Sequence, residues 1–241
     1  MSGRRPVAPP IALSDLSVGY HGRAVLSNVD WAFAPGSMTA LVGPNGGGKS
    51  TLLKTIAGEL RPIGGEIRGN DRDLIAYLSQ TAGFDRDFPI SLRDVVAMGL
   101  WRRLGPFGRI GAAEAAQLDA ALQAVGLNGL EAQAVGTLSG GQLQRALFAR
   151  LILLDAPIVL LDEPFSAIDQ PTVADLLRIV RGWHEEGRTI VAALHDLDQV
   201  RTAFPETMRL EGERAKAGRT EEVLGERGAP RLSFATAEAT A

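Results

Sequence analysis

The chain has 241 residues, of which 45% are hydrophobic and 22% are charged, a composition typical of a globular protein that buries a sizeable core. Its formal charge of −3 argues against a strongly basic nucleic-acid-binding surface, so we expect no nucleic-acid partner. The absence of cysteine excludes disulfides, thiolate metal sites and cysteine nucleophiles.

No apolar run approaches the roughly 20 residues of a membrane-spanning helix. Residues 151–154 and 158–161 come nearest, but Asp155 and Pro157 interrupt them. We therefore expect a cytoplasmic protein whose membrane role, if any, comes through a partner. Residues 1–10 lack the apolar centre of a signal peptide and predict a flexible N-terminus, and residues 235–241 predict a flexible tail.

Residues 11–40 predict short strands joined by turns, which would form an antiparallel unit ahead of the core. Strands are expected at 11–20 and 29–33, with turns at 21–22 and 35–36. Tyr20 ends the first strand, where its ring could stack on an adenine. A partly buried structural tyrosine is at least as good an interpretation from these residues alone.

Residues 38–57 predict a buried strand, a glycine-rich turn and a helix in immediate succession. The turn satisfies G-x-x-x-x-G-K-[ST], in which backbone N–H groups surround phosphates, the lysine reaches the β and γ oxygens and the hydroxyl binds Mg²⁺. Glycine permits positive φ and close approach of the backbone, and the helix start directs its dipole at the anion. The predicted phosphate site consists of Gly43, Pro44, Asn45, Gly46, Gly47, Gly48, Lys49, Ser50 and Thr51.

Residues 64–69 and 74–78 predict further strands, and Gln80 stands at the end of the second. Its amide could reach Mg²⁺ or the attacking water, although an isolated loop glutamine is usually solvated. From residue 90 the pattern becomes helical, with Ser91 as a helix cap and an apolar repeat at 113–125 that Gly126 ends. We predict a helical subdomain over about 90–154, inserted in an α/β core.

The sequence LSGGQ, residues 138–142, directly precedes a helix expected to run to about residue 154. Ser139 and Gln142 have the spacing of a capping box, so an ordinary helix start is one interpretation. Gly140 and Gly141 favour another, because each glycine in a helix interior costs about 1 kcal/mol. We prefer a second anion site, built on exposed N–H groups at this helix start.

Two later apolar strands end in polar residues at the carboxyl edge of the predicted parallel sheet, where α/β proteins bind ligands. Residues 158–161 lead into Asp162 and Glu163, and residues 189–194 lead into His195. Asp162 is expected to hold Mg²⁺ and Glu163 to polarise or orient the hydrolytic water. His195 could donate to a γ-phosphate, although a lone histidine is more often structural.

Taken in order, Tyr20, GPNGGGKST, Gln80, LSGGQ, IVLLDEP, residues 166–169 and His195 resemble the ATP-binding subunits of ABC transporters. The resemblance covers residues 11–225. It implies a P-loop NTPase (RecA-like) α/β core with an antiparallel β subdomain and the inserted α-helical subdomain, over residues 11–234. It also implies hydrolysis of ATP with Mg²⁺ by a head-to-tail homodimer, in which each ATP lies between the P-loop of one protomer and the LSGGQ of the other.

The resemblance also implies a role for single residues. By position, Tyr20 is similar to the adenine-stacking aromatic and Gln80 to the Q-loop residue. Glu163 is similar to the catalytic base, Asp169 to the D-loop aspartate that contacts the other protomer, and His195 to the switch histidine. Lys49 with the rest of its loop, and the stretch Ser139, Gly140, Gly141 and Gln142, would contact the nucleotide; Ser50, Gln80 and Asp162 would hold Mg²⁺ with the ATP.

Residues 88–90, 94–99, 103–111 and 163–165 resemble the metal-ion import subfamily, for zinc or manganese, with iron-chelate importers next nearest. This implies an integral-membrane permease on whose cytoplasmic side the chain sits, and a solute-binding protein that acts with the permease. We expect the permease groove near Gln80, Phe84 and residues 90–101, with Trp101 and Phe107 at its rim. Core packing of these two aromatics fits the sequence equally well.

Two rival classes remain. A soluble ABC ATPase of DNA repair or translation usually carries a long coiled coil or two tandem cassettes, whereas this chain has one of each motif and no heptad run. A P-loop kinase is a weaker rival, because it has no use for LSGGQ. The three histidines stand at no spacing that would build a metal site, so the Mg²⁺ of the nucleotide is the only metal expected.

Overall fold

The computed structural model describes residues 8–80, 88–105 and 108–225. Within them, six strands form a sheet of order β5-β6-β7-β3-β8-β9, in which β9 alone is antiparallel to its neighbour. The neighbouring strands β6, β7 and β3 are buried at every residue, which confirms the prediction of buried strands from their apolar sequence. The strands are β3 (Met38–Val42), β5 (Ile75–Leu78), β6 (Ile158–Asp162), β7 (Thr189–Ala193), β8 (Glu206–Glu211) and β9 (Arg214–Arg219).

A second, antiparallel sheet has the order β2-β1-β4 and contains β1 (Ile11–Tyr20), β2 (Arg23–Phe33) and β4 (Gly64–Arg68). The predicted strand at 29–33 was too short, since β2 begins at Arg23. His21 and Gly22 both have positive φ, 50° and 76°, so a two-residue turn lets Tyr20 pair with Arg23 at once.

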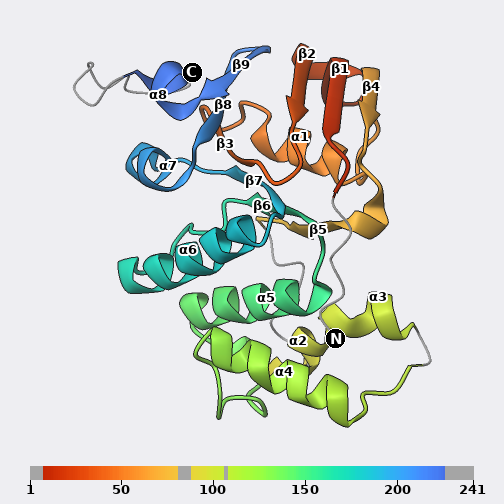
Figure 1. Ribbon diagram of the computed structural model, residues 1–241, viewed down its shortest axis with the longest axis vertical. Helices are drawn as coiled ribbons and strands as arrows, with labels where there is room; N and C mark the ends of the chain where they lie inside the picture. Colours follow the sequence, from red (N-terminus) through yellow and green to blue (C-terminus); the bar gives the residue numbers. More distant parts are fainter. Residues whose placement is uncertain (1–7, 81–87, 106–107, 226–241) are drawn as a thin grey trace, which may run out of the picture.

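Helix α1 (Lys49–Ile56) lies between the two sheets, as Figure 1 shows. Its buried residues Leu52, Leu53 and Ile56 share one apolar cluster with side chains of both sheets. The opposite face of the six-stranded sheet packs on α5 (Gly140–Leu154) and α6 (Gln170–Glu185) in a second cluster. The short helices α7 (Leu197–Ala203) and α8 (Thr220–Leu224) lie near β8 (Figure 1).

The range of about 90–154, over which a helical subdomain is predicted, includes α5, and its other helices lie beyond α5 (Figure 1). It contains α2 (Leu92–Ala97), α3 (Trp101–Leu104) and α4 (Ala112–Ala124). Ser91 caps α2 by accepting the Asp94 N–H at 3.1 Å, and Gly126, with φ of 69°, follows the end of α4. Both helix boundaries therefore follow the predicted cap and stop residues.

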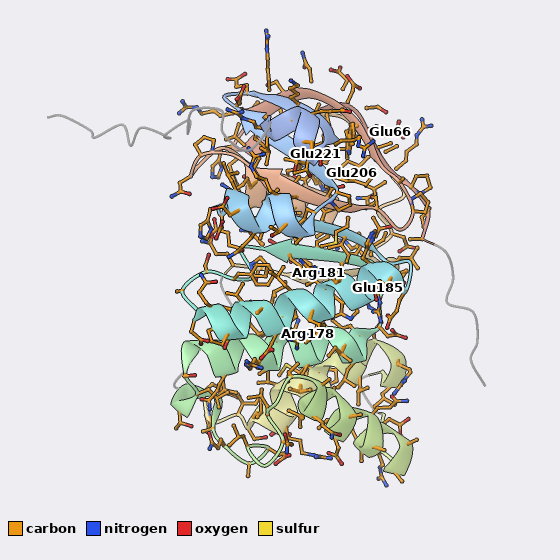
Figure 2. All side chains as sticks on the ribbon, turned by 60° about the vertical axis from the view of Figure 1, so that its left-hand side comes forward. Glu66, Arg178, Arg181, Glu185, Glu206 and Glu221 are labelled. Carbon is orange, nitrogen blue, oxygen red and sulfur yellow. The ribbon has the colours of Figure 1, made fainter. Side chains whose placement is uncertain are left out.

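Helix α6 is amphipathic. Its buried side holds Val173, Leu176, Val180 and Trp183, while Arg178, Arg181 and Glu185 lie on its exposed side, as Figure 2 shows. None of the described helices has the length and apolarity needed to cross a bilayer.

Candidate functional site

The loop between β3 and α1 surrounds a cavity of about 230 Å³, which Gln80 and Glu163 close from the ends of neighbouring strands. Gly46 and Gly48 have φ of 75° and 88°, a conformation that L side chains rarely adopt. A Cβ on Gly48 would also lie 2.9 Å from Leu26 Cγ. Helix α1 starts directly after this glycine, so its first N–H groups face the cavity. The other lining residues are Asn45, Gly47, Lys49, Ser50 and Thr51.

Lys49 is the cation of this cavity, and its side chain folds back onto the loop. The residue is only 5% exposed, and Nζ donates to the carbonyl oxygens of Gly43 at 2.9 Å and Pro44 at 3.0 Å. Burial lowers the pKa of Lys49, and the carboxylates of Glu163 and Asp162 act in the opposite direction. An anion that enters the cavity would give this ammonium acceptors of opposite charge in place of two carbonyls.

Asp162 ends β6 beneath the cavity and is 1% exposed. Its Oδ1 accepts a hydrogen bond from Ser50 Oγ at 2.9 Å, and its Oδ2 accepts one from Tyr77 Oη at 3.3 Å. Burial raises the pKa of Asp162, against the two hydrogen bonds, and burial likewise raises the pKa of Tyr77. A hydroxyl and a carboxylate are hard oxygen ligands of the kind that Mg²⁺ takes beside phosphate, so these residues fit that ion.

Glu163 lies at the carboxyl edge of the sheet, one residue beyond β6. Its φ of 49° is left-handed, which is uncommon for a residue other than glycine, and its N–H donates to Ala193 O at 3.1 Å. Gln80 Nε2 and Ser166 Oγ each donate to Glu163 Oε2 at 3.0 Å. With its backbone bonded to β7 and two side-chain donors on one oxygen, Glu163 lines the same cavity as Lys49.

The LSGGQ segment is a helix start with a complete capping box. Ser139 Oγ accepts the Gln142 N–H at 3.2 Å, and Gln142 Oε1 accepts the Ser139 N–H at 2.9 Å. Among the residues that the structure describes, a Cβ on Gly140 or Gly141 would meet nothing closer than 3.4 Å, which is ordinary contact. Packing inside one copy of the chain therefore does not require the two glycines.

Tyr20, Asp169 and His195 are among the predicted site residues that do not line the cavity. Tyr20 ends β1 and is 44% exposed, and His195 is exposed two residues after β7. Asp169 caps α6, where Thr172 N–H donates to Oδ1 and Thr172 Oγ1 to Oδ2, each at 2.9 Å. These bonds hold the pKa of Asp169 below its usual range. As the structure describes it, the lining of the cavity around Lys49 contains none of these residues and no residue of LSGGQ.

Two functional contacts escaped the sequence analysis. Tyr77 bonds the second oxygen of Asp162, and Ser166 bonds Glu163. Tyr77 carried a signal, because it puts a hydroxyl inside a strand that is otherwise apolar. Ser166 gave none by itself, since a loop serine is ordinary.

Among described residues, no group of three or more His, Cys, Asp or Glu side chains gathers that could hold a metal ion. The oxygen pair of Ser50 and Asp162 is therefore the metal-binding candidate that the geometry offers, and it needs phosphate oxygens and water to complete a coordination shell.

A family model described as "ABC transporter" matches residues 26–166 of the chain. The manganese transport system ATP-binding protein MntB of Bacillus subtilis is 35% identical over 221 residues, which cover 89% of this chain and 88% of that protein. The zinc transport system ATP-binding protein TroB of Treponema pallidum is 34% identical over 206 residues, which cover 83% of this chain and 77% of that protein.

The fold has solved counterparts as well. A structure described as an inward-facing conformation of a putative metal-chelate type ABC transporter aligns with a TM-score of 0.79 at 29% sequence identity. The alignment covers 89% of this chain and 84% of that one.

Proposed function

This chain belongs to the ABC transporter family, whose ATP-binding domain hydrolyses ATP, and we propose that it is the ATPase subunit of an importer for a divalent metal ion, zinc or manganese. The observation that carries the catalytic part is the meeting of Lys49, Gln80 and Glu163 around one glycine-lined cavity at the sheet edge. The names of the manganese and zinc relatives support the cargo.

ATP binding begins with an exchange of partners at Lys49. The ammonium leaves the carbonyl oxygens of Gly43 and Pro44 for the β and γ phosphate oxygens, while the N–H groups at the start of α1 donate to the same anion. Ser50 and Asp162 would hold Mg²⁺, which when bound neutralises charge on the phosphates. Tyr20 would stack on the adenine from the end of β1.

Hydrolysis is assigned to Glu163. Its carboxylate accepts a proton from the water whose oxygen attacks the γ-phosphorus, and the β–γ bridging oxygen leaves with ADP. Gln80 donates directly to this carboxylate at 3.0 Å, which places its amide beside the carboxylate to orient the attacking water. His195, exposed near the same sheet edge, would donate to the γ-phosphate.

A head-to-tail homodimer is supported by LSGGQ, which does not contribute to the described lining of the cavity around Lys49. The glycines of LSGGQ are not required by contacts within the protomer, and their N–H groups lie at an exposed helix start. They would bind the γ-phosphate of an ATP held by the other protomer, with Ser139 and Gln142 beside them. Asp169, exposed at the start of α6, would contact the partner across the same interface.

Membrane attachment would come through the permease of the transport system, on its cytoplasmic side, with a solute-binding protein acting beyond it. Trp101 supports a docking surface because it is 65% exposed, so it does not pack in the core. With Ala97, Leu104 and Ile110 it borders an apolar hollow of about 470 Å³. Phe84 and Phe107, predicted at the same groove, lie outside the described residues.

The cargo is tested in a deletion strain of the source organism grown under chelation. Growth should fail and be rescued by one added metal, and cell-associated zinc and manganese measured during starvation should show which ion is depleted. A wild-type copy of the gene should restore uptake, while the Glu163→Gln copy should not.

Two outcomes would overturn the proposal at different levels. Normal metal content with a defect in uptake of an iron chelate would move the cargo and leave the transport ATPase standing. Normal uptake of every solute, with a defect in DNA repair or translation, would favour a soluble non-transport ABC ATPase.

A further inference from the structure

Helix α5 contacts the loop that carries Glu163 at two points one helical turn apart. Gln144, two residues beyond LSGGQ, donates from Nε2 to the carbonyl oxygen of Pro164 at 2.7 Å. Phe148, four residues later on the same side of the helix, stacks on Phe165 with ring centroids 6.4 Å apart. Two successive loop residues, Pro164 and Phe165, are thus fixed by one helix face.

The hydrogen bond from Gln144 to Pro164 fixes the backbone directly after Glu163. Pro164 is buried and directly follows Glu163, so its carbonyl needs a partner away from water. On its other side Glu163 is held through its N–H by Ala193 of β7, and its φ of 49° is a conformation that the surroundings must impose. The Gln144 amide therefore supports, from the helix side, the Pro164–Phe165 peptide, one residue beyond the left-handed Glu163.

The same helix carries LSGGQ at its first turn. Gln142 completes the capping box, and Gln144 lies two residues further along. Arg145, the next residue, donates to Asp175 at 2.8 Å and to Thr172 at 3.3 Å on α6, and Thr172 is the residue that Asp169 caps. Helix α5 thus joins two parts of the chain. One is LSGGQ, which would face the nucleotide held by the partner, and the other is the loop of Glu163, which faces the cavity of the same protomer.

From these contacts we infer that Gln144 is a positioning residue for Glu163. Its amide holds the Pro164–Phe165 peptide, one residue beyond Glu163, so that the carboxylate points into the cavity, and it ties that alignment to the orientation of the LSGGQ helix. The inference rests on the proposed role of Glu163 as the base. Gln144 itself touches neither the cavity nor its lining residues other than through this peptide.

The test uses the full-length chain, with steady-state hydrolysis of Mg-ATP, ATP affinity and thermal melting measured on each variant. Gln144→Met keeps the length of the side chain and removes the donor, and Gln144→Glu puts a carboxylate against the Pro164 carbonyl. Gln117→Met is the matched control, because Gln117 on α4 also loses one hydrogen bond, which its Oε1 accepts from Arg103, and does not line the cavity.

We expect kcat to fall roughly tenfold in Gln144→Met and further in Gln144→Glu, the size of one lost hydrogen bond expressed in the transition state. KM for ATP and the melting temperature should change no more than in the Gln117→Met control. In a Glu163→Gln background Gln144→Met should cause no additional loss, because the amide acts only through that carboxylate.

Three results would overturn the inference: a kcat within twofold of wild type, a loss of kcat that is matched by the control, or an equal fall in both backgrounds. A failure of the proposed role of Glu163 as the base can be told apart from a failure of the inference about Gln144. In that case the Glu163→Gln single variant would hydrolyse ATP at the wild-type rate. If Gln144→Met does not fold, Gln144→Glu carries the same comparison.

Discussion

Ser50 Oγ lies 2.9 Å from Asp162 Oδ1, and this hydrogen bond joins two residues that are 112 positions apart in the chain. Ser50 belongs to the first turn of α1, and Asp162 is the last residue of β6. The bond places a hydroxyl and a buried carboxylate at the floor of the cavity that Lys49 and Glu163 border.

Lys49→Ala should weaken ATP binding by roughly 100-fold, because two or more charge-assisted hydrogen bonds to phosphate are lost. The fold should survive, since within the described ranges the ammonium donates to two carbonyls of its own loop. Titration with a fluorescent ATP analogue measures the change, and Lys216→Ala on the exposed strand β9 is the control. Wild-type affinity in folded Lys49→Ala would remove the lysine from its assigned role.

Glu163→Gln should bind ATP normally and hydrolyse it about 10²- to 10⁴-fold more slowly, the range for loss of a general base. With Mg²⁺ and ATP it should accumulate as a dimer, which light scattering detects. Adding Ser139→Arg should abolish the dimer by blocking the helix start, whereas Gln123→Arg on the exposed side of α4 should not. A monomer at every concentration, with the ATP intact, contradicts the head-to-tail arrangement.

Asp162→Asn should raise the melting temperature at pH 7 in the absence of nucleotide and metal, although it should remove activity. Burial raises the native pKa of Asp162 above its unfolded value, so the stability gained from the neutral form is present below the unfolded pKa and is lost as pH rises through the native one. At pH 7 the charged wild-type side chain is therefore a cost that asparagine lacks.

The advantage of Asp162→Asn should shrink as pH falls toward about 4, the ordinary range of an aspartate. Melting curves between pH 4 and 8 measure it. Asp119→Asn, which removes a solvent-exposed carboxylate paired with Arg93, should give no such gain. An Asp162→Asn chain that is less stable than wild type at pH 7 would show that the bonds from Ser50 and Tyr77 outweigh the burial of the charge.

Trp101→Asp should prevent binding of the permease while leaving basal ATP hydrolysis unchanged. The stability should change by no more than about 0.5 kcal/mol, the usual size for an exposed position. Co-purification with the permease and a thermal melt distinguish the two effects. Ile63→Asp, at another exposed apolar residue, should keep the permease bound. A large fall in melting temperature with Trp101→Asp would favour a packing role for the tryptophan.

Local pattern was sufficient to predict the elements that carry the site. The glycines and apolar runs of residues 38–57, 138–154 and 158–163 predicted a loop, a helix start and a strand end at the positions where the structure has them. The start of β2 was missed because its first residues, RAVLSN, lack strand alternation, and pairing with β1 across a two-residue turn makes them a strand.

What the sequence by itself determined is the chemistry of each segment, because glycine conformations, helix caps and buried strands depend on neighbours a few residues away. Only the tertiary structure decided which groups meet. The bonds of Tyr77 to Asp162, of Gln80 to Glu163 and of Gln144 to Pro164 depend on which strands are neighbours and where α5 crosses the sheet. These are long-range packing outcomes, set by the burial of two apolar clusters on opposite faces of the sheet, and no short window of sequence contains them.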